Sequence, residues 1–269
     1  MLRLLTLSFC LLLIISCKHD HGDGHTHEDH HDHKHQDHGH HDHDHGIPAE
    51  LTNVLQAHGG QEQWESMKSL SYQMINGEST EDHLIHLQDR RERIEGSNFT
   101  MGYDGIDIWI NADSTYKGNP KFYKNLMFYF YAMPFVLTDE GIFYDEAKPL
   151  VFDGKTYPGV KIGYDEGIGL SPNDEYYIHY DPETNLMEWL GYTVTYFTNE
   201  KSTDLHWIRY TEWDNYNDLI LPKQLTWYKY EDGLPTEASG VRDFVNVEIN
   251  QTEPDSTAFA MVSGSTIVE

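Results

Sequence analysis

Residues 186–198 read LMEWLGYTVTYFT, and this stretch carries the strongest fold signal in the chain. Successive side chains of a strand point to opposite faces of a sheet. Here both faces are largely apolar or aromatic: one carries Leu186, Leu190, Tyr192, Val194 and Tyr196, and the other carries Met187, Trp189, Thr193, Thr195 and Phe197. The stretch therefore predicts a strand in a sheet that is covered on both sides.

A period of two recurs from residue 70 onward, and turn signals such as Asp104-Gly105 and Asp232-Gly233 separate the runs. About ten strands joined by tight turns predict an antiparallel meander. We expect a mainly β (α+β) fold whose curved sheet forms an unclosed or half β-barrel. The predicted strands are Leu70–Asn76, Leu84–Glu95, Phe99–Tyr103, Asp107–Asn111, Gly159–Tyr164, Glu175–Tyr180, Leu186–Thr198, Leu205–Trp213, Leu219–Tyr230 and Gly240–Ile249.

Two short helices are predicted before the strands. Pro48 suits the first turn of a helix, and Gly59-Gly60 marks its end. Between them, Leu51, Val54 and Leu55 share one helix face. A second helix is expected over residues 61–67.

Residues 119–137, NPKFYKNLMFYFYAMPFVL, interrupt the strand pattern. The run begins with the helix-start signal Asn119-Pro120, is too long and apolar for a strand, and contains Pro134, which should kink or end a helix. We expect a central apolar helix that acts either as a buried plug or as a lid over an apolar ligand cavity. The candidate cavity residues are Phe122, Leu126, Met127, Phe130 and Met133.

Residues 1–16 have the features of a secretory signal peptide. Arg3 supplies a positive charge, and the apolar run of residues 4–15 is shorter than the about 20 residues that span a bilayer. The following sequence, Ile14-Ile15-Ser16-Cys17, resembles a bacterial lipobox. We therefore expect Cys17 to be lipidated and to anchor a Gram-negative envelope lipoprotein, at the periplasmic face or outer surface of the outer membrane. The alternative is a soluble secreted protein in which Ser16-Cys17 is incidental.

Residues 17–46 are expected to form a disordered tail, because no aliphatic or aromatic core-former follows the cysteine. Imidazole suits zinc, copper and nickel, and nearby carboxylates add charge or ligation. We expect several exchangeable sites for divalent metal ions, zinc above all. The alternative is a solvated or pH-responsive spacer. The predicted ligands are His19, His21, His25, His27, His30, His31, His33, His35, His38, His40, His41, His43 and His45.

Acidic residues dominate the composition, with 45 Asp and Glu against 18 Lys and Arg and a formal net charge of −27. This balance excludes nucleic acid or an anionic membrane surface as the default partner, because both need a basic footprint. The 18 Tyr, 11 Phe and 6 Trp indicate a folded chain. We expect residues 47–269 to form a single β-rich domain.

Sequence motifs for a phosphate loop, a nucleophile elbow or a His-Glu-x-x-His zinc helix are absent. His58 is expected to cap the first helix. His83 and His86 should point to opposite faces of a strand instead of sharing a metal ion. His179 and His206 are interpreted as histidines packed within the sheet.

Four acidic residues flank one predicted strand and its turn, namely Asp174, Glu175, Asp181 and Glu183. Paired carboxylates can perform acid–base chemistry. In so acidic a chain, a solvated loop is the favoured interpretation.

Five segments carry a resemblance: AHGGQEQW (57–64), GYDGIDIW (102–109), the apolar run 119–137, PNDEYYIHYDPETNLMEWLGYTVTYF (172–197) and LPKQLTWYKYEDG (221–233). Together they resemble an uncharacterised family of Gram-negative envelope lipoproteins of unknown function. The layout also distantly resembles the periplasmic lipoprotein-carrier (LolA/LolB-like) superfamily, whose members hold acyl chains in an unclosed barrel beneath helical lids. The histidine-rich tail departs from those carriers.

The favoured hypothesis is a non-enzymatic, lipid-anchored binding protein, with a metal-binding tail and a β domain that holds an apolar or lipid-like ligand. One alternative is a hydrolase-type enzyme that uses the acids of residues 174–183 with His179 or His206. Another is a structural or interaction lipoprotein with a solid core. A cavity would favour binding, and convergence of the acids and histidines would favour catalysis.

Overall fold

The computed structural model describes residues 46–165 and 171–269. The predicted signal peptide, Cys17 and the thirteen tail histidines lie outside the described residues. The described part falls within one structural unit, Asp42–Glu269.

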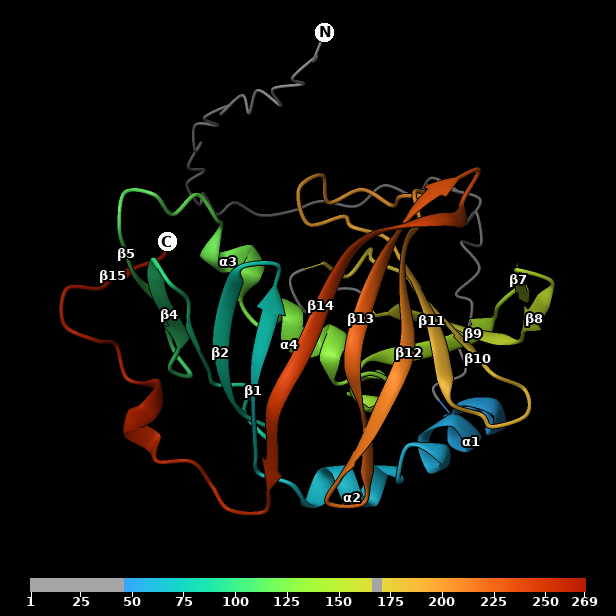
Figure 1. The fold of residues 1–269 in the computed structure, drawn as a ribbon, viewed down its shortest axis with the longest axis horizontal. Coiled ribbons are helices and arrows are strands. Elements are labelled where there is room, and N and C mark those ends of the chain that lie inside the picture. The colour runs from blue at the N-terminus through green and yellow to red at the C-terminus, as the bar shows by residue number, and fades with distance from the viewer. Residues whose placement is uncertain (1–45, 166–170) are drawn as a thin grey trace, which may run out of the picture. The chain divides into compact units, whose positions relative to one another are not determined.

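The described residues form a thirteen-stranded antiparallel sheet and a separate two-stranded hairpin (Figure 1). The order of strands in the large sheet is β15-β5-β4-β3-β2-β1-β14-β13-β12-β11-β10-β9-β6, and β7 pairs with β8. The strands are β1 Ser69–Asn76, β2 Ser79–His86, β3 Glu92–Glu95, β4 Phe99–Tyr103, β5 Ile108–Ala112, β6 Ile142–Glu146, β7 Leu150–Phe152, β8 Lys155–Tyr157, β9 Gly159–Tyr164, β10 Tyr176–Tyr180, β11 Met187–Tyr192, β12 His206–Tyr216, β13 Leu219–Glu231, β14 Leu234–Asn250 and β15 Thr266–Ile267.

The helices are short. Two precede the sheet as predicted, and two lie between β5 and β6. They are α1 Ala49–Ala57, α2 Gln61–Ser66, α3 Pro120–Tyr123 and α4 Leu126–Tyr131, with single 3₁₀ turns at Phe135–Thr138 and Ser256–Phe259. Among the described residues, no helix combines the length and apolar character needed to cross a membrane.

The large sheet stays open, because its edge strands β15 and β6 do not pair with each other within the described residues. The long strands β12, β13 and β14 bend strongly, and their bulges mark the bends (Figure 1). The mainly β class and the curved, unclosed antiparallel sheet predicted from the sequence are confirmed.

Several predicted strand bounds need correction. The run 84–95 is not one strand, because Arg90 takes a left-handed conformation (φ 62°) and the chain turns between β2 and β3. The backbone N–H of His86 donates to the carbonyl of Arg91 across that turn, at 2.9 Å. Strands β6, β7, β8 and β15, of two to five residues, were not predicted.

The strand predicted over 186–198 is shorter, because β11 ends at Tyr192. A bulge between β10 and β11 shifts the register, so Met187 joins the main core with Leu190 instead of sharing a face with Trp189. The Asp174 carboxylate then accepts hydrogen bonds from the Thr195 backbone N–H and hydroxyl, at 2.6 and 2.7 Å. These bonds hold the chain in a turn where the pattern predicts more strand.

The continuous helix predicted over 119–137 is wrong. The segment folds as α3, α4 and a 3₁₀ turn, and it breaks at Asn125, which has a left-handed backbone (φ 57°). The break is held by tertiary hydrogen bonds: the Asn125 backbone N–H donates to the buried Glu92 carboxylate at 2.6 Å, and its side-chain amide donates to the Arg90 carbonyl at 3.1 Å. Asn119 caps α3 as predicted, since its side chain accepts from the Phe122 N–H at 3.2 Å.

Both faces of the sheet are covered, as residues 186–198 predict. Helix α4 and the N-terminal helices contribute to the main hydrophobic core with Leu190 and Ile208. On the opposite face, the β7–β8 hairpin contributes Leu150 and Tyr157 to a second cluster with Trp189 and Trp207.

His58, at the end of α1, joins three elements. The ring is fully buried, its Nδ1 lies 2.9 Å from the Ile220 carbonyl of β13, and its Nε2 lies 3.1 Å from the Met187 backbone nitrogen of β11. These partners require Nδ1 to donate and Nε2 to accept, which is the neutral tautomer. Burial lowers the pKa of His58 to about 4, against the raising effect of the Ile220 carbonyl. His58 therefore lies at the end of α1, as expected, and also connects this helix to β11 and β13 of the sheet.

The neutral form of His58 predicts a loss of stability in acid. The folded-state pKa lies below the unfolded value of about 6.5, so stability is full above that pH and falls as the pH drops toward 4. Between pH 7 and 4.5, wild type should lose about 2–3 kcal/mol more unfolding free energy than His58→Gln. Urea denaturation of both proteins at the two pH values measures this, and equal losses would contradict it.

Candidate functional site

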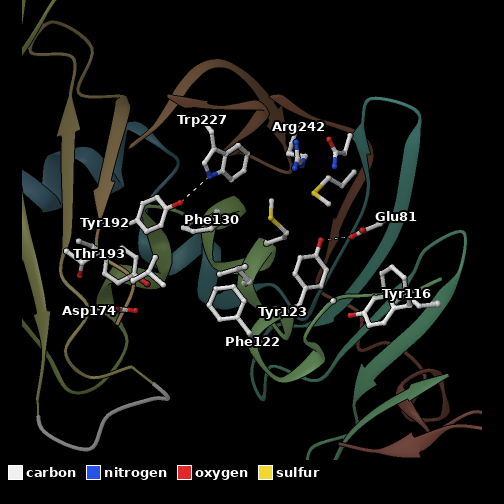
Figure 2. A pocket seen from close by; sticks show the side chains of 18 residues that line it. Glu81, Tyr116, Phe122, Tyr123, Phe130, Asp174, Tyr192, Thr193, Trp227 and Arg242 are labelled. Carbon is white, nitrogen blue, oxygen red and sulfur yellow. Dashed lines mark hydrogen bonds between the residues drawn. The ribbon is translucent and has the colours of Figure 1, made fainter. Parts of the chain in front are cut away.

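A cavity of about 490 Å³ lies between α3, α4 and the strands β1, β2, β4, β10, β11, β13 and β14. Its size falls within the about 300–1,000 Å³ typical of small-ligand pockets. Figure 2 shows aromatic and sulfur-containing side chains directed into it from the helices and from the sheet. The apolar and aromatic part of the lining consists of Met74, Phe99, Tyr116, Phe122, Tyr123, Leu126, Met127, Phe130, Tyr176, Tyr192, Val194 and Trp227.

The structure places four of the five predicted cavity residues on this lining: Phe122, Leu126, Met127 and Phe130. Met133 does not line it and is buried in the main hydrophobic core instead. Their roles as ligand contacts or lid residues remain predictions.

A buried acid–histidine network anchors α3 and α4 to the sheet. Glu81 on β2 accepts a hydrogen bond from the Tyr123 hydroxyl at 2.6 Å and lies 3.3 Å from Nε2 of His83. On the other side of the ring, Nδ1 of His83 lies 3.6 Å from Glu92 of β3. Glu92 in turn accepts the Asn125 N–H, so the network touches both α3 and the start of α4.

In this network, the charges of His83 and Glu81 each favour the ionised form of the other. Burial alone would lower the pKa of His83, but Glu81 and Glu92 on either side raise it above its ordinary value. Burial alone would raise the pKa of Glu81, but hydrogen bonds from His83 and Tyr123 lower it. A buried histidine between two carboxylates is therefore stabilised as the cation, with Nε2 donating to Glu81 and Nδ1 facing Glu92 in an ion pair without a hydrogen bond.

Polar groups occupy separate places on the lining. Arg242 of β14 and Glu81 of β2 lie at one end, and Asp174 and Thr193 lie at the other (Figure 2). Asn76 of β1 also belongs to the lining, next to Arg242 across the strand pair, since Ile75 pairs with Asp243. Burial raises the pKa of Asp174 despite its hydrogen bonds from Thr195.

One internal hydrogen bond orders the aromatic wall between these ends. The Trp227 indole N–H donates to the Tyr192 hydroxyl at 3.2 Å (Figure 2). Apart from these groups, Glu81 and the tyrosine hydroxyls, the cavity lining is apolar, which suits a ligand with an extended apolar part.

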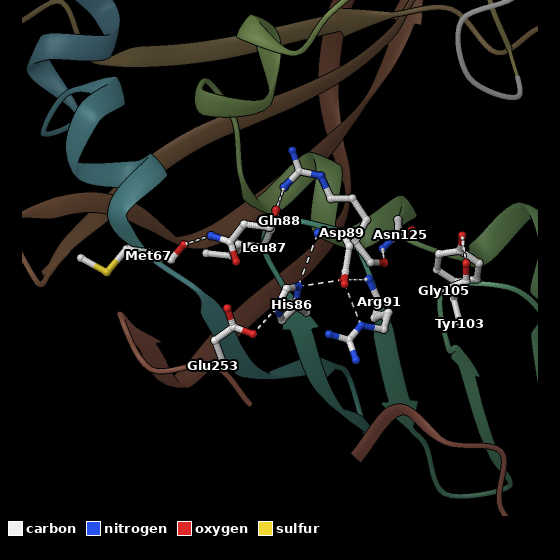
Figure 3. A network of polar contacts seen from close by, with 11 residues as sticks. Met67, His86, Leu87, Gln88, Asp89, Arg91, Tyr103, Gly105, Asn125 and Glu253 are labelled. Carbon is white, nitrogen blue, oxygen red and sulfur yellow. Dashed lines mark hydrogen bonds and ion pairs between the residues drawn. The ribbon is translucent and has the colours of Figure 1, made fainter. Parts of the chain in front are cut away.

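His83 and His86 have separate partners, in agreement with their predicted opposite directions. Nδ1 of His86 lies 2.7 Å from Asp89, and its Nε2 lies 3.2 Å from Glu253 (Figure 3). Over residues 46–165 and 171–269, no group of three or more His, Cys, Asp and Glu side chains is placed to hold a metal ion.

The acids and histidines of the enzyme hypothesis are dispersed. Asp174 lines the cavity, whereas His179 is buried beside Trp207 and has a pKa lowered to about 4 by burial. The ring of His206 instead packs against Tyr192 and Tyr230. In the part of the chain that the structure describes, no hydrogen bond joins any two of these three groups.

Sequence reasoning missed the polar members of the site: Glu81, Glu92 and Arg242. Each stands in a strand that also carries polar residues facing solvent, so alternation alone does not single them out. Tyr123 lies within the predicted apolar helix, but its hydroxyl partner on β2 is 42 residues away in the sequence.

Comparison with known families finds a match for residues 111–230 to the model of a family of unknown function, DUF6503. This agrees with the resemblance to an uncharacterised family inferred from the sequence. The match runs from the end of β5 to the end of β13, less one residue, and includes α3, α4 and much of the cavity wall. A comparison with curated proteins finds no significant match.

Several solved structures are similar in outline. A DUF1329 family protein from Desulfovibrio piger ATCC 29098 has a TM-score of 0.49 and 12% identity, covering 79% of this chain and 96% of that chain. A LolA superfamily protein from Nitrosomonas europaea has a TM-score of 0.47 and 9% identity, covering 78% and 97%. The Mycobacterium tuberculosis lipoprotein LppX has a TM-score of 0.26 and 10% identity, covering 55% and 88%. No functional conclusion follows from similarities at these scores.

The buried network predicts a large effect of removing Glu92. The Glu92→Ala substitution leaves His83 with one carboxylate and the buried Asn125 N–H without an acceptor. Breaking such a pair should lower the unfolding free energy by about 3–5 kcal/mol. Glu95→Ala, on the same strand, removes an exposed pair with Arg93 and should cost less than about 1 kcal/mol. Denaturant titration measures both, and equal losses would contradict the assigned role of Glu92.

Proposed function

We propose that the folded domain is a binding module for an apolar or amphipathic, lipid-like ligand held in the cavity beside α3 and α4. The observation that carries this proposal is the cavity itself: about 490 Å³, with aromatic and aliphatic walls. A solid interior would have favoured a purely structural role.

Burial of apolar surface supplies the binding free energy. Each buried methylene contributes about 0.8 kcal/mol, or about 25 cal/mol per Å² of apolar surface. A chain of several methylenes lying against Phe122, Phe130 and Trp227 would therefore bind without many hydrogen bonds. The few polar groups on the lining would orient it.

The wall formed by α3 and α4 is suited to let the ligand in. Both helices are short, and Lys124 and Asn125 between them are not helical. Phe122 is half-buried and contacts Tyr196 and the exposed Phe197, so this part of the wall is made of aromatic rings near solvent. Movement of α3 would open the cavity at the cost of the Tyr123–Glu81 hydrogen bond.

We place this module at the cell envelope on the basis of the sequence. The lipobox-like Ile14-Ile15-Ser16-Cys17 supports lipidation at Cys17 and anchoring in the outer membrane. A dual or triple acyl anchor would hold the protein stably, as additive methylene burial requires. A membrane-held domain would then meet lipid-like ligands at their source.

The tail supports a second binding activity. Its thirteen histidines and eight acidic residues between 19 and 45 would chelate zinc, or copper or nickel, at several exchangeable sites. Metal ligation needs neutral imidazole, so acid should release the metal.

The cavity proposal predicts that a charge on its wall prevents ligand binding. Leu126→Asp should weaken binding of the neutral probe N-phenylnaphthylamine by about tenfold or more, because a carboxylate would have to be buried against it. Tyr129→Asp, on the same helix but at an exposed position off the lining, should bind like wild type. Probe fluorescence measures both, and unchanged binding by a folded Leu126→Asp protein would contradict the proposal.

The tail proposal predicts where zinc binds. A soluble chain beginning at residue 18 should take up several zinc ions at pH 7.5 and far fewer at pH 5.5, because free histidine titrates near about 6.5. The same chain without residues 19–45 should lose this uptake. Isothermal calorimetry counts the ions, and undiminished uptake by the shortened chain would show that the folded domain binds the metal.

A further inference from the structure

Arg242 is the only lysine or arginine on the cavity lining, and it forms no ion pair within the part of the chain that the structure describes. Its guanidinium donates to the Val241 carbonyl at 2.8 Å. The other described arginines each pair with a carboxylate: Arg90 with Asp139, Arg91 with Asp89, Arg93 with Glu95 and Arg209 with Glu188.

The unpaired state of Arg242 is notable in a chain with 45 acidic and 18 basic residues. The nearby acids are engaged elsewhere. Glu81 bonds Tyr123 and His83, and it lies near enough to Arg242 for the guanidinium to help lower its pKa, but the two form no ion pair; Asp174 bonds Thr195. Asp243, the next residue, accepts from the Gln224 amide at 2.7 Å.

The guanidinium is held in position without an ion pair. Its central carbon lies 5.4 Å from the centre of the Trp227 ring, which is a cation–π contact. The indole thus lies beside the guanidinium, and the N–H groups other than the one bonded to Val241 are its donors toward a ligand. Arginine presents these donors in a fork that matches a carboxylate or a phosphate.

The lining is therefore polarised. Arg242 lies at one end, where Glu81 also lies with its carboxylate bonded to Tyr123 and His83, and Asp174 lies across the cavity beyond the aromatic wall (Figure 2). Asn76 belongs to the Arg242 end, because its neighbour Ile75 on β1 pairs with Asp243 on β14. An anion is favoured beside Arg242 and disfavoured beside Asp174, so a ligand with one anionic end has a single preferred direction.

We propose that the cavity binds an amphiphile with an anionic headgroup, a carboxylate or a phosphate monoester, with the head at Arg242 and the apolar chain along Phe130 and Trp227. This inference rests on the proposed function and names its ligand class. The neutral amide of Asn76 offers the head a second donor.

The experiment compares four probes that share one chain: dodecanoate, dodecyl phosphate, dodecanol and dodecyltrimethylammonium. Binding to the soluble chain beginning at residue 18 is followed by its tryptophan fluorescence. The two anions should bind about tenfold or more tightly than dodecanol, and the cation should bind more weakly than dodecanol. Arg242→Gln should reduce the affinity for both anions to about the variant's own affinity for dodecanol, so that the preference for anions disappears.

Two variants control this result. Lys223→Gln removes one positive charge from β13 at an exposed position off the lining, and it should keep the preference for anions. Arg242→Lys keeps the charge but loses the fork, and it should retain part of the preference. Thermal melts confirm that each variant folds.

The outcomes separate the two proposals. Equal binding of the anions and dodecanol by wild type, or an unchanged preference in Arg242→Gln, would overturn the headgroup assignment while leaving the apolar cavity as a binding site. Failure of all four probes would overturn the proposed function itself. Binding of inorganic phosphate as tight as that of dodecyl phosphate would also overturn the assignment, since the chain would then contribute nothing.

Discussion

The concave face of an open sheet has to be covered, and in this protein the cover is short. A closed barrel buries its interior by joining its edges, but here β15 and β6 stay apart. The central segment supplies only α3, α4 and a 3₁₀ turn, ten helical α-residues against long, bent strands. Phe128, Tyr131 and Phe135 fill one part of the concavity completely. The remaining part, between Phe122, Phe130 and Trp227, is the cavity. The proposed binding site therefore exists because the helical segment is too short to cover the whole concave face of the sheet.

The shortness of these helices also explains the buried polar network. Helices of four and six residues have little stability of their own, since isolated helices need about 12–15 residues. Tertiary contacts must hold them, and Glu92 and Glu81 provide these by accepting from Asn125 and Tyr123. His83 between the two carboxylates lets both be buried, because an unpaired buried charge would cost several kcal/mol. The wall is thus attached at two points on neighbouring strands, and Tyr123 is the attachment that lies on the cavity.

The sequence predicted strands well where turn signals flank a run with a period of two. Strands β4 and β9 were predicted with the bounds found, Phe99–Tyr103 and Gly159–Tyr164, and the double-sided apolar stretch at 186–198 indicated a sheet covered on both faces. The break at Asn125 could not be predicted, because its hydrogen-bond partner Glu92 is 33 residues away in sequence. Four cavity residues were found because apolar runs are visible in a sequence. Arg242 was missed because only the three-dimensional fold shows that it lines the cavity and forms no ion pair.

The central claim is that the folded domain carries a lipid-like molecule, and native mass spectrometry tests it most directly. Residues 47–269 would be produced without the signal and the tail and purified gently from a lysate that contains membranes. We predict an adduct with the mass of a lipid, lost after extraction with organic solvent and taken up again when lipid is returned. A bare protein mass under the same conditions, unchanged after lipid is added, would contradict the account.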